Sequence, residues 1–124
     1  MFQIIDNTIH LTRGDIASFD VEMMQSDGRY YEFQAGEVLR FKVFEAKQCD
    51  KILLQKDIEV TEPTTRVTIF LTGEETSIGP LINKPTKYWY EVELNPDTAP
   101  LTLIGYDING EKLIMLYPEG GVKA

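Results

Sequence analysis

The stretch Lys87-Tyr88-Trp89-Tyr90-Glu91-Val92-Glu93-Leu94 decides the fold of this chain. Apolar and aromatic residues at positions 88, 90, 92 and 94 alternate with Lys87, Trp89 and two glutamates. A period of two is typical of a β-strand that is buried on one face and faces water on the other. We therefore predict a strand over 87–94 with Tyr88 and Tyr90 on its buried face, and we expect the other segments to be strands that pack with it.

Further alternating segments occur at 8–12, 16–24, 38–46, 52–60, 66–71, 101–108 and 111–117. Turn residues separate them, and the best signals are Ser26-Asp27-Gly28-Arg29 and the pair Asn109-Gly110, which predicts a hairpin. With the strand at 87–94 they make about seven or eight strands, the rhythm of a β-sandwich or barrel. In the segment 52–60 we expect Ile52, Leu54, Ile58 and Val60 to face inward, with Lys56 as a break in the pattern.

The connection before residue 87 predicts a short helical turn near 73–79 or a plain loop, and both stay open. Thr72 followed three residues later by Glu75 has the spacing of a capping box. Pro80 and Pro85 would keep such a helix short.

Tyr88 begins a late strand after a connection that contains proline, which is the place of the tyrosine corner in immunoglobulin-like sandwiches. In that interpretation its hydroxyl bonds backward to the connecting loop, and Tyr90 fills the core. The alternative is that Tyr88 is a β-former beside a turn. Together the patterns predict an all-β, immunoglobulin-like antiparallel β-sandwich, a single domain over 1–118 with a flexible tail at 119–124.

Composition narrows the classes of partner. The chain has 124 residues and a formal net charge of −8, which repels phosphate groups, so we expect neither nucleic acid nor a membrane as partner. The single cysteine, Cys49, lies in a polar loop over 48–51 and allows no disulfide within the chain. The N-terminus lacks the features of a signal peptide, so we expect the protein to be made in the cytoplasm and to stay soluble.

The residues that could carry chemistry have simpler explanations. His10 alternates outward between two apolar residues, and no Gly-x-Ser-x-Gly motif accompanies it. Asp20 with Glu22, and Glu91 with Glu93, share a strand face as a general acid and base might, but a water-facing sheet surface explains them equally well. We therefore predict no enzyme, no cofactor and no metal.

Two further motifs that could indicate a function also have simpler explanations. Residues 107–111 resemble a calcium loop only faintly, because they lack its spacing and its further ligands, and a hairpin turn explains them. Arg13-Gly14-Asp15 spells an adhesion tripeptide that also arises by chance.

Trp89 is the most informative single residue, because alternation points it to the polar face beside Glu91 and Glu93. Phe44 also falls on the polar face of its segment. If both belong to one sheet, they form an aromatic patch rimmed by charge, which would be an interaction surface. The alternative is that a connecting loop, 30–33 or 72–85, covers Trp89 as a second small core.

One stretch resembles a known family. Leu11-Thr12-Arg13-Gly14-Asp15-Ile16-Ala17-Ser18-Phe19, followed by the segments 38–46, 52–60 and 87–94, resembles the opening of phage tail and baseplate modules found at the N-terminus of upper baseplate proteins. The resemblance covers about residues 8–95, and the segment 101–117 lies outside it. It implies a phage- or prophage-encoded immunoglobulin-like structural module, a virion component without catalytic residues, whose partners are other phage structural proteins or copies of itself.

Three functions are therefore under consideration. The first is a non-enzymatic assembly module that acts through protein–protein contacts and can include copies of itself as a homo-oligomer. The second is a small-ligand or carbohydrate-binding sandwich that uses Trp89, Tyr30 and Tyr31 as stacking platforms. The third is a hydrolase, for which the sequence offers no nucleophile and base in a recognised arrangement.

Overall fold

The computed structural model describes residues 1–45, 51–105 and 110–119. Within these residues it contains nine strands and one helical turn, arranged as a sandwich of a seven-stranded and a two-stranded sheet. The elements are β1 (Phe2–Ile5), β2 (Thr8–Thr12), β3 (Ala17–Val21), β4 (Val38–Phe44), β5 (Ile52–Glu59), β6 (Val67–Leu71), α1 (Gly73–Thr76), β7 (Thr86–Leu94), β8 (Leu101–Ile104) and β9 (Leu113–Tyr117). The all-β sandwich prediction is confirmed.

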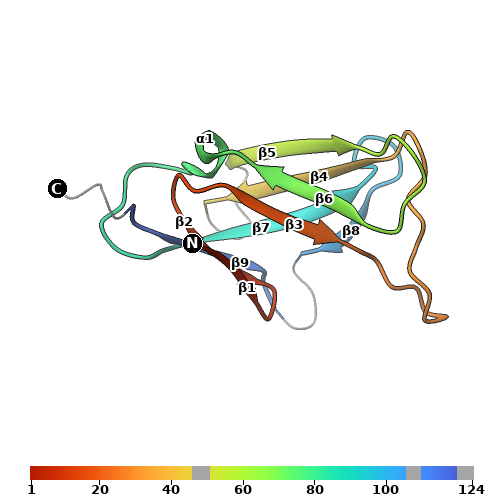
Figure 1. Cartoon of the computed structure of the whole chain (residues 1–124), viewed down its shortest axis with the longest axis horizontal. Helices are drawn as coiled ribbons and strands as arrows, with labels where there is room; N and C mark the ends of the chain where they lie inside the picture. Colours follow the sequence, from red (N-terminus) through yellow and green to blue (C-terminus); the bar gives the residue numbers. More distant parts are fainter. Residues whose placement is uncertain (46–50, 106–109, 120–124) are drawn as a thin grey trace.

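The larger sheet has the strand order β1-β2-β9-β7-β4-β5, with β8 beside β7, and the smaller sheet pairs β3 with β6. Figure 1 shows β3 and β6 lying across the larger sheet. All strand pairs are antiparallel except β2 and β9, which run parallel with Ile9 opposite Ile114. An all-antiparallel sandwich was the expectation. Because β2 and β9 lie near opposite ends of the sequence, their pairing needs no tight hairpin and can be parallel.

The structure adds a first strand that the sequence patterns did not predict. β1 pairs with β2 across a turn at Asp6 and Asn7, whose φ values are 50° and 66°. Positive φ at both central residues is the geometry of a type I′ hairpin turn, and Asn and Asp tolerate it. This strand brings the number to nine, above the expected seven or eight.

The two last strands pair differently from the prediction. β8 pairs with the Val92–Leu94 end of β7, and β9 pairs with its Thr86–Trp89 end, so the two strands lie end to end along β7. The predicted turn residue Asn109 lies outside the described residues. Cys49 lies outside them too, although the strands on either side of it, β4 and β5, pair antiparallel as a hairpin would.

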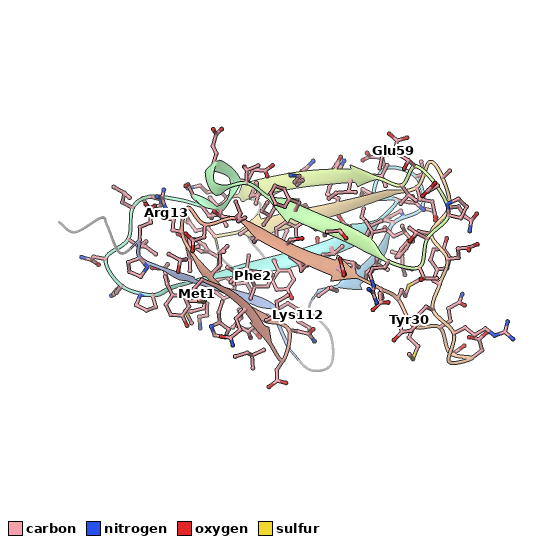
Figure 2. The ribbon with its side chains drawn as sticks, in the orientation of Figure 1. Met1, Phe2, Arg13, Tyr30, Glu59 and Lys112 are labelled. Carbon is pink, nitrogen blue, oxygen red and sulfur yellow. The ribbon has the colours of Figure 1, made fainter. Side chains whose placement is uncertain are left out.

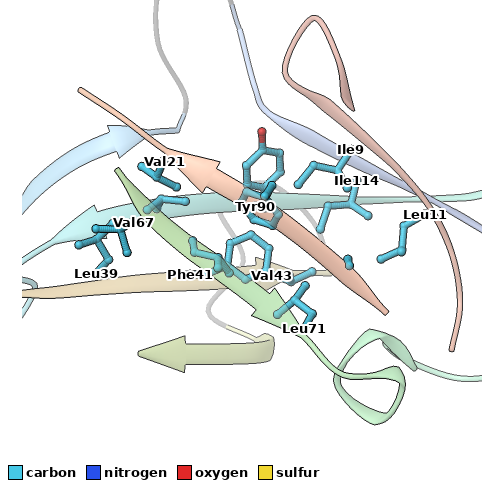
Figure 3. Packing of buried hydrophobic residues seen from close by; sticks show 14 of the residues in the cluster. Ile9, Leu11, Val21, Leu39, Phe41, Val43, Val67, Leu71, Tyr90 and Ile114 are labelled. Atoms are coloured by element: carbon cyan, nitrogen blue, oxygen red, sulfur yellow. The ribbon is translucent and has the colours of Figure 1, made fainter. Parts of the chain in front are cut away.

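The core fills the space between the two sheets. β4 supplies Leu39, Phe41 and Val43, each at 0% exposure, and β7 supplies the buried Tyr90 beside them (Figure 3). The alternating residues of β3, β6 and β7 are buried as predicted. Alternation therefore assigned these inner faces correctly.

Ile52 is an exception. Its predicted inward orientation is wrong, because the register of β5 against β4 shifts next to Phe44 and leaves Ile52 opposite Phe44 and 42% exposed. A bulge of one residue moves a side chain to the other face. Lys56, the break in the pattern, extends its ammonium to the Phe70 carbonyl of β6 and to Glu75 at 2.9 Å. An inward-pointing charge on an edge strand disfavours pairing of that edge with a strand of another molecule.

The helical turn is confirmed as a single turn, α1. The Thr72 hydroxyl accepts from the Glu75 amide, and the Glu75 carboxylate accepts from the Thr72 amide at 2.9 Å, which completes the capping box. No helix long and apolar enough to cross a membrane occurs in the part of the chain that the structure describes.

Candidate functional site

Four apolar side chains form a row across the outer face of the larger sheet, the face turned away from β3 and β6. The register places Ile52 opposite Phe44, Phe44 opposite Trp89, and Trp89 opposite Leu113. Each of the last three residues has at least one chain neighbour buried in the core, namely Val43, Tyr88 with Tyr90, and Ile114, so these side chains point outward. We call the four residues the apolar row. The row brings Phe44 and Trp89 together, as expected if their strands shared a sheet.

The row is partly covered. Ile52 is 42% exposed, whereas the other three side chains are half-buried. The indole nitrogen of Trp89 is fully covered and has no hydrogen-bond partner among the residues that the structure describes. The Lys87 ammonium lies 5.8 Å from the centre of the Trp89 ring, and the Lys42 ammonium lies 5.6 Å from that of Phe44. Trp89 is thus neither fully exposed nor enclosed in a second core.

Charged residues lie beside the row on the same face. Lys42 forms ion pairs with Glu91 at 3.1 Å and Glu93 at 2.8 Å. Burial alone would lower the pKa of Lys42, but the hydrogen bonds to Glu93 and Glu91 outweigh it and raise this pKa. The two carboxylates are therefore held by a lysine between them, which makes them rim charges rather than a free acid and base.

A second ion-pair group follows along the same face. The Arg40 guanidinium bonds to Asp57 at 2.8 Å and to Asp97 at 3.1 Å. The hydrogen bond from Arg40 lowers the pKa of Asp57. This end of the face is fixed by ion pairs and carries more acidic than basic groups.

Tyr88 and Tyr90 point to the opposite side, into the core. Tyr88 is 4% exposed, and its hydroxyl lies against Gly79, where an added Cβ would come within 2.6 Å. It contacts the preceding loop, as expected of a tyrosine corner, but among the described residues no hydrogen bond from its hydroxyl is found. Tyr90 is 5% exposed, and its hydroxyl donates to the Asn7 carbonyl at 2.7 Å.

The other predicted carboxylate pair is also bound in structural contacts. Asp20 accepts a hydrogen bond from Thr68 at 2.6 Å, and Glu22 pairs with Arg66 at 3.4 Å. His10 lies 2.9 Å from the Tyr117 hydroxyl. No group of three or more metal-ligating side chains occurs within 1–45, 51–105 and 110–119.

The tripeptide at 13–15 has a structural role. The Arg13 guanidinium, 12% exposed, donates to the Gly79 carbonyl at 2.8 Å and to Glu119 at 3.1 Å. The Asp15 carbonyl accepts from Thr76 at 2.6 Å. These bonds tie the turn after β2 to the loop after α1. Glu119, the first residue of the predicted tail, is held by the same arginine.

The aromatic residues of the ligand-binding hypothesis lie at different ends of the molecule. The Tyr31 hydroxyl bonds to Glu37 at 2.9 Å, and Glu37 also accepts from Asn95, so Tyr31 lies at the start of β4. Trp89 lies opposite Phe44, at the end of β4, about 20 Å along the strand. Figure 2 places Tyr30 on the projecting loop between β3 and β4. These three rings do not line one groove.

Two members of the row were missed from the sequence. Leu113 was assigned to a strand without a face, and Ile52 was assigned to the core. The signal that could have found them is cross-strand register, which requires knowing that β4, β5, β7 and β9 are neighbours. Searches of protein-family models, of curated proteins and of solved structures found no match to this chain.

Proposed function

We propose that this chain is a non-catalytic assembly module that contributes one face of a β-sandwich to a phage or prophage tail or baseplate. The observation that carries the proposal is the apolar row of Ile52, Phe44, Trp89 and Leu113 on the outer face of the larger sheet. Apolar side chains grouped on the outer face of a sheet are expected where another protein covers them.

The composition of this face also supports a protein partner. Tryptophan and phenylalanine are enriched at the centres of interfaces, where they act as anchors. Ion-paired residues such as Lys42 and Arg40 beside the row correspond to the polar rim that surrounds such a centre.

The phage assignment rests on the resemblance of residues 11–19. In the structure this stretch contains the end of β2, a turn with Gly14 at φ 90°, and the start of β3, which is compatible with the arrangement in the resembling modules. The chain would then be a virion component that binds other tail proteins or copies of itself.

The test is incorporation into particles. Particles produced by the encoding organism are purified, and the chain is quantified in the tail fraction by mass spectrometry for wild type, Ile52→Lys and Ile16→Lys. Ile52 lies in the row, whereas Ile16 is 66% exposed in the turn before β3 and serves as the matched control. Both substitutions add the same charge at an exposed isoleucine.

We expect wild type and Ile16→Lys in the tail fraction and a strong loss of Ile52→Lys, with all three chains folded by circular dichroism. Absence of the wild-type chain from the particles would refute the phage assignment. Normal incorporation of Ile52→Lys would refute the role of the outer face.

A further inference from the structure

The outer face has opposite charge character on the two sides of the apolar row. On the side toward the start of β7, the register groups Lys87 with Met115 and His10. On the side toward the end of β7 lie two basic and four acidic side chains: Lys42, Arg40, Glu91, Glu93, Asp57 and Asp97. The row therefore separates a basic side from a net acidic side.

Lys87 and Glu91 lie at equal distances from Trp89, two residues before and two residues after it on β7. They are on the same face as Trp89, because side chains two residues apart on a strand point to the same side. Each is thus about 7 Å from Trp89 along the strand.

This symmetry makes the face self-complementary in one orientation. If two copies stack face to face about a two-fold axis along the apolar row, their β7 strands run antiparallel and each row covers its copy. Lys87 then lies over Glu91 of the second copy, and Glu91 over Lys87 of the second copy. If the axis instead runs along β7, each lysine faces a lysine and each glutamate a glutamate, which is unfavourable.

We infer that the partner of this face is a second copy of the chain, stacked with its β7 antiparallel and with Lys87 paired to Glu91 across the interface. This inference deepens the proposed function, on which it rests, by naming the partner and the geometry. Isologous contacts of this kind, in which the same patch is used on both copies, are the commonest in soluble oligomers.

The contact is small. Four neighbouring strands span about 15 Å, so the row by itself is at the lower end of protein interfaces and populates a dimer only at high concentration. High local concentration is the condition inside an assembled particle.

A charge exchange tests the geometry. Sedimentation velocity from micromolar to about millimolar protein is measured for wild type, Lys87→Glu, Glu91→Lys and the double variant. We expect the weight-average mass of wild type to rise reversibly toward a dimer. Each single variant sets like charges against each other at two symmetric positions, which should weaken the dimer about tenfold. The double variant exchanges the charges across the interface and should associate more strongly than either single variant, although Glu91→Lys also removes the ion pair of Glu91 with Lys42 of the same chain.

Glu62→Lys, the same charge change in the exposed loop after β5, is the matched control and should associate like wild type. A monomer at every concentration would overturn the inference, and so would single variants that associate as wild type or a double variant that associates no better than the single variants. These outcomes leave the particle test of Ile52→Lys untouched, so failure of the second-copy partner and failure of the proposed function are distinguishable.

Discussion

Replacing Tyr90 by phenylalanine removes one hydroxyl group from the centre of the fold. The Tyr90 ring packs against Phe41, with ring centres 5.8 Å apart, and its hydroxyl donates to the carbonyl of Asn7 in the turn between β1 and β2. Phenylalanine keeps the ring and loses the donor. At neutral pH we expect Tyr90→Phe to be less stable than wild type by about 1 kcal/mol.

The sign of this difference should reverse at high pH. Burial raises the pKa of Tyr90 from its ordinary 10.0 to about 12. Between these values the unfolded chain has released the phenol proton and the folded chain still holds it, so the unfolded state binds fewer protons and stability falls as pH rises. The full loss, reached near pH 12, is about 2–3 kcal/mol. Tyr90→Phe has no phenol at this position and does not undergo this loss. The free energies of unfolding of wild type and variant should therefore be equal near pH 11.

Urea unfolding followed by far-ultraviolet circular dichroism, from neutral pH to about pH 11.5, measures both stabilities. Tyr30→Phe is the matched control, because Tyr30 is 48% exposed, and its difference from wild type should not reverse. A difference between Tyr90→Phe and wild type that stays constant over this range would refute the assignment of Tyr90 as a buried, neutral hydrogen-bond donor.

Two further variants test the loop contacts by the same unfolding measurement. Gly79 has φ 65°, and a Cβ there would lie 2.6 Å from the Tyr88 hydroxyl, so Gly79→Ala should lower the free energy of unfolding by about 2 kcal/mol or more. Gly28 has φ 86° and nothing within 4 Å of an added Cβ, so the control Gly28→Ala should lower it only by the backbone strain, about 1 kcal/mol. Equal losses in the two variants would contradict the Tyr88 contact. Hydrogen bonds from Lys56 and from the Thr72 amide lower the pKa of Glu75, so its stabilisation is present above its ordinary pKa of 4.5 and is lost as pH falls below it. Glu75→Gln should therefore be less stable than wild type at neutral pH and approach it in acid, whereas an unchanged difference would contradict the pairing.

The strands were predictable because one face of each is buried and the other is in water. Alternation at 87–94 and in β3, β4 and β6 identified the inner residues directly, since the period of two is a consequence of the pleat. Spacing alone also predicted the capping box of Thr72 and Glu75, which is a local interaction within one turn.

What the sequence did not reveal depends on contacts between distant segments. Ile52 changes face because of a bulge against β4, and strand alternation contains no information about a partner's register. The parallel pair of β2 and β9 and the attachment of both β8 and β9 to β7 are likewise tertiary choices. β1 was missed because its short strand shows no alternation, although Asp6 and Asn7 form a good hairpin turn.

The candidate site was half predictable for the same reason. Trp89 and Phe44 were found because each is an aromatic residue on the otherwise polar face of its own strand. Leu113 and the exposure of Ile52 became visible only when the strand order placed them in one row. The position of Lys42 between two glutamates also needed the register of β4 against β7.

Photo-crosslinking from the row tests the central claim most directly. A benzophenone amino acid replaces Phe44 in one variant and Phe70 in the other; Phe70 is 45% exposed on β6, on the opposite sheet, and is the matched control. Both chains are incorporated into particles and irradiated. If the outer face of the larger sheet is the contact surface, position 44 crosslinks to a second polypeptide, or to a second copy, and position 70 does not. Crosslinks from position 70 with none from position 44 would contradict it.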